Sequence, residues 1–258
     1  MLPVLGDARV LVDIPLAIDP AEVLRFQGYK PGGEGPGPEV TVLFDEALAL
    51  GRQVMAPRAV VRWIAVDQRA ADRLVADGVR LEIPHIGERW GAVEYVAAGV
   101  CTIGAALERR VGELWDAREF PLAMMLDSVG SGAVESLAEY VNDLLCQEGL
   151  PQALRVTNRV SPGYGGWDVA EQPRLFELTD AAAVGVTLNA ACFMTPEKTI
   201  SILVGAGRDA RVDDYFSQCA RCWMRDCAYR RVPARATLKI GGAAPPMPPR
   251  DTAPRTTG

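Results

Sequence analysis

The chain has 258 residues, of which 49% are hydrophobic, so it can bury a sizeable core in one large domain or two small ones. Its formal net charge of −6 argues against wholesale nucleic-acid binding, which requires a basic face. No apolar run approaches the roughly 20 residues that cross a bilayer. No basic and apolar leader opens the sequence, so we expect a cytoplasmic protein.

The N-terminal part of the sequence predicts alternating helices and strands. Asp19, Pro20 and Glu22 form a capping box with proline at the first helical position, which predicts a short helix through Arg25. A glycine- and proline-rich loop follows at residues 31–38. Further along, periodicity predicts a helix over Glu39–Val54, a strand over Ala59–Val66, a helix over Gln68–Ala76 and a strand over Val93–Cys101.

The middle of the chain predicts two helices. Leu107, Val111, Leu114 and Trp115 recur at helical spacing and predict a stripe that faces the core. A long helix is predicted over Pro121–Glu148, with a kink or close packing at Gly130-Ser131-Gly132. Three acidic residues recur at intervals of four on this helix, and their spacing alone favours a solvated face: Glu135, Glu139 and Asp143.

The C-terminal part predicts a helix, a hairpin and a tail. Asp168 and Glu171 repeat the capping-box pattern and predict a helix through Leu178. Val184–Cys192 and Lys198–Val204 are strand-like and predict a hairpin. The last 18 residues contain five prolines and little to bury, which predicts disorder.

A more specific signal lies between these elements. Arg159, Pro162, Gly163 and Tyr164 form an Arg-x-x-Pro-Gly-Tyr motif, followed by an amphipathic helix and a Gly-Val-Thr-Leu strand. In this order and spacing, the segment resembles the S-adenosylmethionine-binding core of the activation domain of cobalamin-dependent methionine synthase. Other short stretches up to about Arg231 resemble the stand-alone activation subunits of that family.

The resemblance implies an α+β fold, with a mainly antiparallel twisted sheet packed with helices. It implies a domain over residues 1–207 that binds S-adenosylmethionine, a cysteine-rich extension over 208–240 and a disordered tail over 241–258. An arginine suits the carboxylate of this ligand, so Arg159 is its candidate partner. Gly163 permits a tight turn after Pro162, and Tyr164 offers a ring face and a hydroxyl. Glu135 matches a family glutamate that lines the ligand site.

The resemblance also implies a reaction partner. The activation domain supports reductive remethylation of a corrinoid that has fallen to the inactive cob(II) state, so this chain would be part of a cobalamin-dependent methyltransferase system. The corrinoid would be held by a partner methyltransferase protein, because the only histidine, His85, does not lie in a corrinoid-binding Asp-x-His-x-x-Gly motif. A flavodoxin or a ferredoxin would supply the electron.

The cysteines suggest a metal centre. Six cysteines without a secretion signal are better explained as thiols or metal ligands than as disulfides. Cys219, Cys222 and Cys227 form a compact array, and Cys192 is the candidate fourth ligand. Thiolates suit a [4Fe-4S] cluster or zinc, and free thiols are the third alternative.

Two departures from the family pattern leave other functions open. The family has an aspartate near the first helix where this chain has Phe26-Gln27-Gly28-Tyr29, and Thr-Glu-Ser where it has Asn189-Ala190-Ala191. These changes favour the alternative of an iron-sulfur redox protein that reduces a corrinoid protein without using S-adenosylmethionine. A scaffold that binds the methyltransferase and shields its corrinoid is a second alternative.

Overall fold

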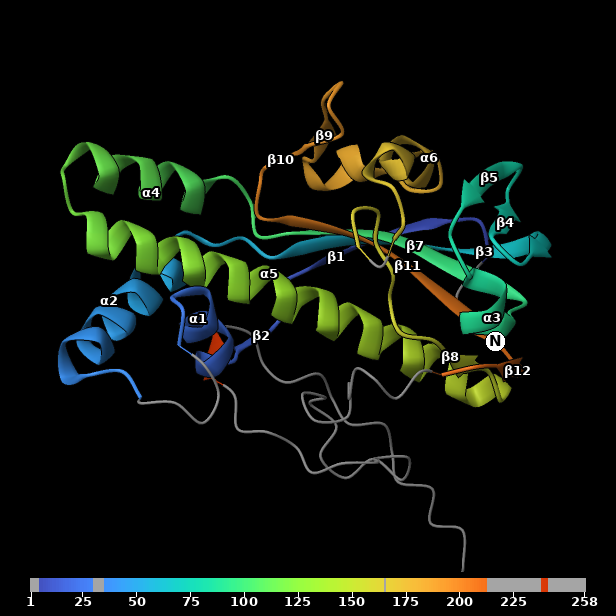
Figure 1. Cartoon of the computed structure of the whole chain (residues 1–258), viewed down its shortest axis with the longest axis horizontal. Coiled ribbons are helices and arrows are strands. Elements are labelled where there is room, and N and C mark those ends of the chain that lie inside the picture. Colours follow the sequence, from blue (N-terminus) through green and yellow to red (C-terminus); the bar gives the residue numbers. More distant parts are fainter. Residues whose placement is uncertain (1–4, 30–34, 165, 213–237, 241–258) are drawn as a thin grey trace, which may run out of the picture.

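The computed structural model describes residues 5–29, 35–164, 166–212 and 238–240. Its centre is an antiparallel sheet in the order β5-β4-β3-β7-β11-β8, with β1 paired to β3 (Figure 1). The strands of this sheet are β1 (Ala8–Val12), β3 (Arg58–Ala70), β4 (Arg73–Ala76), β5 (Val79–Glu82), β7 (Tyr95–Thr102), β8 (Arg155–Val156) and β11 (Thr199–Gly207).

The remaining strands form three short pairs outside this sheet. β9 pairs with β10, β12 with β6, and β13 with β2, all antiparallel. Their bounds are β2 (Leu16–Ile18), β6 (Gly91–Ala92), β9 (Thr187–Leu188), β10 (Met194–Thr195), β12 (Asp209–Ala210) and β13 (Leu238–Ile240).

Helices cover both faces of the sheet. One layer contains α5, which runs along the length of the molecule, with α1, α2 and α4 beside it (Figure 1). The helices are α1 (Pro20–Phe26), α2 (Pro38–Val54), α3 (Ile86–Trp90), α4 (Ala106–Asp116), α5 (Phe120–Gly149) and α6 (Gln172–Glu177). Three short 3-10 turns lie at Leu150–Gln152, Val169–Glu171 and Ala181–Val184. The expected α+β class and antiparallel sheet are therefore confirmed.

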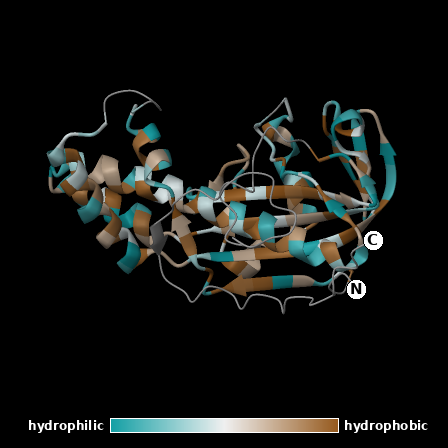
Figure 2. Cartoon of the chain, turned by 90° about the horizontal axis from the view of Figure 1, so that it is seen from below, coloured by the Kyte–Doolittle hydropathy of each residue, from teal (hydrophilic) through white to brown (hydrophobic). Residues whose placement is uncertain are grey.

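Alternation along β3 explains the two layers. Ala59, Val61 and Trp63 belong to the core under α5, whereas Val60 and Ile64 belong to clusters on the opposite face. Successive side chains of a strand point to opposite faces, so this alternation buries hydrophobic residues on both faces of the sheet. Figure 2 accordingly shows hydrophobic residues concentrated along the central strands.

Close packing fixes α5 against its neighbours. A Cβ on Gly130 would lie 2.7 Å from Cδ2 of Leu107, and one on Gly132 would lie 2.9 Å from Cγ2 of Val23. The Gly130-Ser131-Gly132 stretch is therefore a close-packing point for α4 and α1, as expected. Asp19 caps α1 by accepting a hydrogen bond from the Ala21 N–H at 2.9 Å.

Three predicted elements were wrong. Gln68–Ala76 is not a helix but the end of β3 and the strand β4. β11 does not pair with the segment before it; it pairs with β7 and β8, while β9 and β10 form their own small hairpin. Trp115 does not face the core: it is 45% exposed and its ring centroid lies 5.0 Å from that of Phe120.

No helix among the described residues is both long enough and apolar enough to cross a membrane.

Candidate functional site

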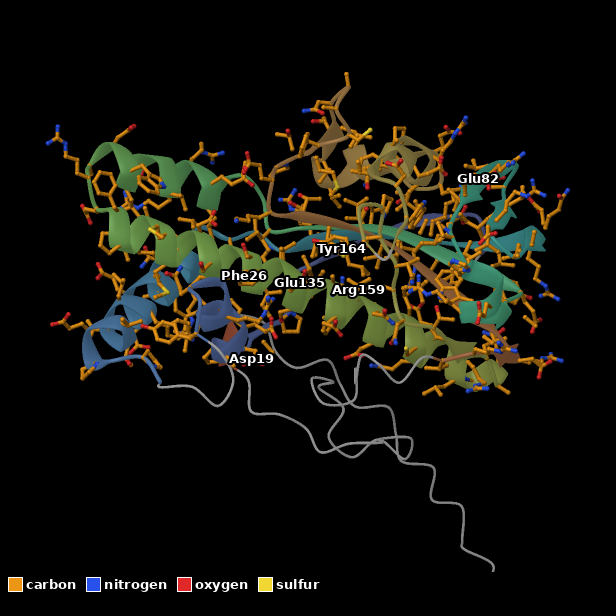
Figure 3. All side chains as sticks on the ribbon, viewed as in Figure 1. Asp19, Phe26, Glu82, Glu135, Arg159 and Tyr164 are labelled. Carbon is orange, nitrogen blue, oxygen red and sulfur yellow. The ribbon has the colours of Figure 1, made fainter. Side chains whose placement is uncertain are left out.

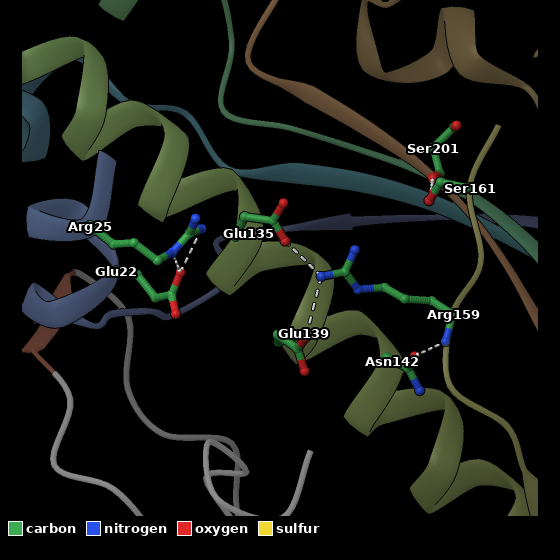
Figure 4. A network of polar contacts seen from close by, with 8 residues as sticks. All are labelled: Glu22, Arg25, Glu135, Glu139, Asn142, Arg159, Ser161 and Ser201. Carbon is green, nitrogen blue, oxygen red and sulfur yellow. Dashed lines mark hydrogen bonds and ion pairs between the residues drawn. The ribbon is translucent and has the colours of Figure 1, made fainter. Parts of the chain in front are cut away.

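A charged cluster on α5 brings together two of the predicted site residues. The Nη2 atom of Arg159 donates hydrogen bonds to Oε2 of Glu135 at 2.7 Å and to Oε1 of Glu139 at 3.2 Å (Figure 4). The side chain of Arg159 is 18% exposed, that of Glu135 33% and that of Glu139 15%. The solvated-face interpretation of the acidic stripe is therefore wrong for these two glutamates, and Asp143 is buried as well.

Asn142 positions the backbone of Arg159. Its Oδ1 accepts a hydrogen bond from the Arg159 N–H at 2.9 Å, and its Nδ2 donates to the Thr157 carbonyl at 3.5 Å. The amide is fully buried, so these contacts are not exchanged with water. The side chain of Asn142 thus holds the backbone at Arg159 against α5. The side chain of Arg159 itself extends along α5 toward Glu135 (Figure 4).

The strand β11 holds the other side of this segment. Val160 and Leu203 form a bridge through two backbone hydrogen bonds, and the Ser161 hydroxyl donates to the Ser201 carbonyl at 2.6 Å. The Gly205 N–H donates to Oγ1 of Thr157 at 2.9 Å. The segment that carries Arg159 is therefore attached to both the sheet and the helix.

Electrostatics keep the guanidinium of Arg159 charged. Burial lowers the pKa of Arg159. The charges of Glu139 and Glu135, and their hydrogen bonds to the guanidinium, raise it by more than burial lowers it, so the pKa of Arg159 lies above its ordinary value. The Cys101 thiol lies within the field of this cluster: burial raises its pKa to about 12, opposed by the charge of Arg159 and supported by that of Glu135. Cys101 is therefore a protonated core residue, not a nucleophile.

The predicted turn forms directly after Arg159. The Tyr164 N–H donates to the Ser161 carbonyl at 3.2 Å, and Gly163 has a φ of +89°. A Cβ on Gly163 would meet only Cβ of Val169, at 4.0 Å, so the glycine is required by the backbone angle rather than by crowding. Pro162 is buried, whereas the Tyr164 ring is 73% exposed and lies above α5 in Figure 3.

The first helix borders the same surface. Phe26 on α1 is 43% exposed, the guanidinium of Arg25 lies 4.6 Å from its ring centroid, and α1 packs against α5. In the Phe26–Tyr29 stretch, Gln27 donates to Oγ of Ser128 at 2.6 Å and to the Met124 carbonyl at 3.1 Å. Gln27 therefore fastens α1 to α5.

Of the four candidate metal ligands, Cys192 alone lies among the residues that the structure describes. Cys192 is half-buried in the β9–β10 turn with a φ of +63°, where Asn189 accepts hydrogen bonds from the N–H groups of Ala191 and Phe193. Cys219, Cys222 and Cys227 lie outside the described residues. The part of the chain that is described contains no group of three or more potential metal ligands.

Sequence reasoning missed two residues of the cluster. Glu139 was assigned to a solvated stripe, although its spacing of four from Glu135 places both carboxylates on one face of α5. Asn142 follows Val141 in the apolar pattern of the helix, and an amide at such a position was the available signal for a buried hydrogen-bonding role.

Fold and site together define an α+β domain in which a long helix presents paired carboxylates to an arginine on an adjacent loop. No family model matches the chain, and no curated protein matches it. A solved structure described as "Crystal Structure of the MetH Reactivation Domain bound to AdoHcy" matches with a TM-score of 0.61 at 16% sequence identity, covering 83% of this chain and 81% of that chain. The fold is thus that of a methionine synthase activation domain.

Proposed function

We propose that this protein binds S-adenosylmethionine and acts as the activation subunit for reductive remethylation of the corrinoid of a B12-dependent methyltransferase of the methionine synthase type. The observation that carries the proposal is the meeting of Arg159, from the Arg-x-x-Pro-Gly-Tyr motif, with Glu135 on α5. The solved structure of the same fold contains S-adenosylhomocysteine, the demethylated form of the proposed ligand, which supports this choice.

The residues present fit such a ligand. The Nε atom of Arg159 is buried, and no described residue accepts a hydrogen bond from it, so the guanidinium retains a donor for the ligand carboxylate. Glu135 is partly exposed and can accept from the ligand ammonium. The backbone of Pro162 and Gly163 shapes the turn beside Arg159, and the exposed ring of Tyr164 is available to cover the adenosine.

The partner holds the corrinoid in this proposal. An electron from a flavodoxin or a ferredoxin and a methyl group from S-adenosylmethionine restore methylcobalamin on the partner. The chain itself binds and orients the methyl donor, within the cytoplasm.

The cysteine-rich extension, residues 208–240, completes the proposal. Cys219, Cys222 and Cys227, with Cys192, would hold a [4Fe-4S] cluster that relays the electron, or a zinc ion. Of these four, only Cys192 lies among the described residues, and its half-buried position in a turn is compatible with a ligand role.

Calorimetric titration of anaerobically purified protein with S-adenosylmethionine tests the proposal. Arg159→Ala should weaken binding by about 2 kcal/mol or more, roughly 30-fold, because it removes a charge-assisted contact. Arg174→Ala, which removes an exposed arginine on α6, is the matched control and should leave the affinity unchanged. Equal affinity of the Arg159→Ala variant and the unaltered protein would refute the site assignment.

The alternative of an iron-sulfur redox protein without S-adenosylmethionine has one specific observation in its favour. The Phe26–Tyr29 stretch has no acid where the family that the chain resembles has an aspartate, and its Gln27 is hydrogen-bonded to α5. Bound iron and a visible absorption spectrum, together with no calorimetric signal for S-adenosylmethionine, would select this alternative.

A further inference from the structure

The charges of the cluster on α5 do not balance. Two carboxylates, of Glu135 and Glu139, share one guanidinium, that of Arg159. The adjacent ion pairs are balanced: Arg25 with Glu22 at 2.9 Å, and Lys198 with Asp127 at 2.7 Å. Asp143 follows one turn further along α5 and has contacts of its own. The cluster of Glu135, Glu139 and Arg159 therefore carries a net charge of −1.

Glu139 supplies the charge in excess. Glu135 makes the shorter contact with Arg159, at 2.7 Å against 3.2 Å for Glu139. Glu139 is also the less exposed of the two carboxylates, at 15% against 33%, so water screens its charge less.

We propose that Glu139 is a specificity-determining residue that makes the site prefer the sulfonium ligand over its demethylated product. This inference rests on the proposed function. S-adenosylmethionine carries an ammonium, a carboxylate and a sulfonium, so its net charge is positive, whereas S-adenosylhomocysteine has lost the sulfonium charge and is neutral. A site with a net negative charge therefore attracts the donor more strongly than the product.

Methyl transfer removes the positive charge that the cluster attracts. When the methyl group is transferred to the electron pair of the reduced corrinoid on the partner, the carbon–sulfur bond breaks and its electron pair stays on sulfur. The positive charge on sulfur disappears in the same step. The product consequently leaves a site that retained the donor, which favours turnover.

The magnitude is measurable by titration. Removing one unit charge from a partly buried site changes the affinity for a cationic ligand by roughly tenfold. Calorimetry should compare S-adenosylmethionine, S-adenosylhomocysteine and sinefungin, which carries an ammonium near the position of the sulfonium. Glu139→Gln keeps the shape and the acceptor for Arg159, and it should lower the preference for both cationic ligands over S-adenosylhomocysteine by about tenfold. Glu177→Gln, an exposed carboxylate on α6, is the control and should change nothing.

The outcomes separate this inference from the proposed function. If the unaltered protein binds sinefungin and S-adenosylhomocysteine equally well, the inference is overturned without any variant. The same holds if Glu139→Gln binds all three ligands with unchanged ratios, and in both cases the proposed function stands. If none of the three ligands binds the unaltered protein, the proposed function itself fails, and this inference with it.

Discussion

Replacing Asn142 by alanine tests whether the helix positions the segment that carries Arg159. The substitution leaves the Arg159 N–H, which now donates to Oδ1 at 2.9 Å, without its partner. Such an orphaned donor costs about 1–3 kcal/mol, and alanine regains about 0.5 kcal/mol of helix propensity. The contact of Nδ2 with the Thr157 carbonyl, at 3.5 Å, adds little because it is at the limit of a hydrogen bond. We expect a net loss of about 2 kcal/mol.

This loss should appear in two assays. Thermal unfolding should show a midpoint about 4–8 °C lower, as expected for a domain of this size. Titration with S-adenosylmethionine should show weaker binding, because the guanidinium would no longer be held in register with Glu135. Gln53→Ala, on the exposed surface of α2, is the control for the removal of a polar helix residue. A change in unfolding free energy below about 0.5 kcal/mol would refute the reasoning, since a buried hydrogen bond should count for more.

Two further predictions follow from packing and burial. Gly130→Ala should destabilise the fold by about 1–2 kcal/mol in chemical denaturation, because the new methyl group would collide with the fully buried Leu107; Gly112→Ala, where no atom lies within 4 Å, should instead stabilise α4 by about 0.5–1 kcal/mol. Equal effects of the two substitutions would contradict the packing at Gly130. Burial raises the pKa of Cys101 from 9.0 to about 12, so the unfolded chain releases this proton first and stability should fall as pH rises from 9 toward 12. Cys101→Ala should show a shallower fall by up to about 1.4 kcal/mol per pH unit, and parallel curves for the two proteins would refute the assignment.

Local signals in the sequence predicted much of the fold. The Asp19 cap, the length of α5 and the position of β7 each depend on residues that are close in sequence, and each prediction was confirmed within a few residues. Such signals act through side chains one turn or one residue apart, so the sequence displays them directly.

Pairing over long distances was not predictable in the same way. β11 pairs with β7, about a hundred residues earlier, and the residues of β11 contain no signal that identifies its partner strand. The error over Gln68–Ala76 has a local cause: Leu74 and Ala76 alternate with more exposed residues, a period of two that was available but too short to outweigh the helical interpretation.

The candidate site shows the same division. The Arg-x-x-Pro-Gly-Tyr motif marked Arg159, and the family resemblance marked Glu135, but periodicity could not place the two side chains in contact. Glu139 was missed because helical spacing reveals which residues share a face, not which loop covers that face. The covering segment is fixed by β11, so its position is a tertiary property.

The origin of the cluster's residues has a consequence for how the protein can change over time. Two of its three charged groups, and the amide that fixes the third, come from three successive turns of the single helix α5. With a rise of about 1.5 Å per residue, the spacing of Glu135, Glu139 and Asn142 is set by the helix alone. Insertions and deletions in the surrounding loops can therefore alter which partner reaches the site while the spacing of the two carboxylates and the amide stays constant.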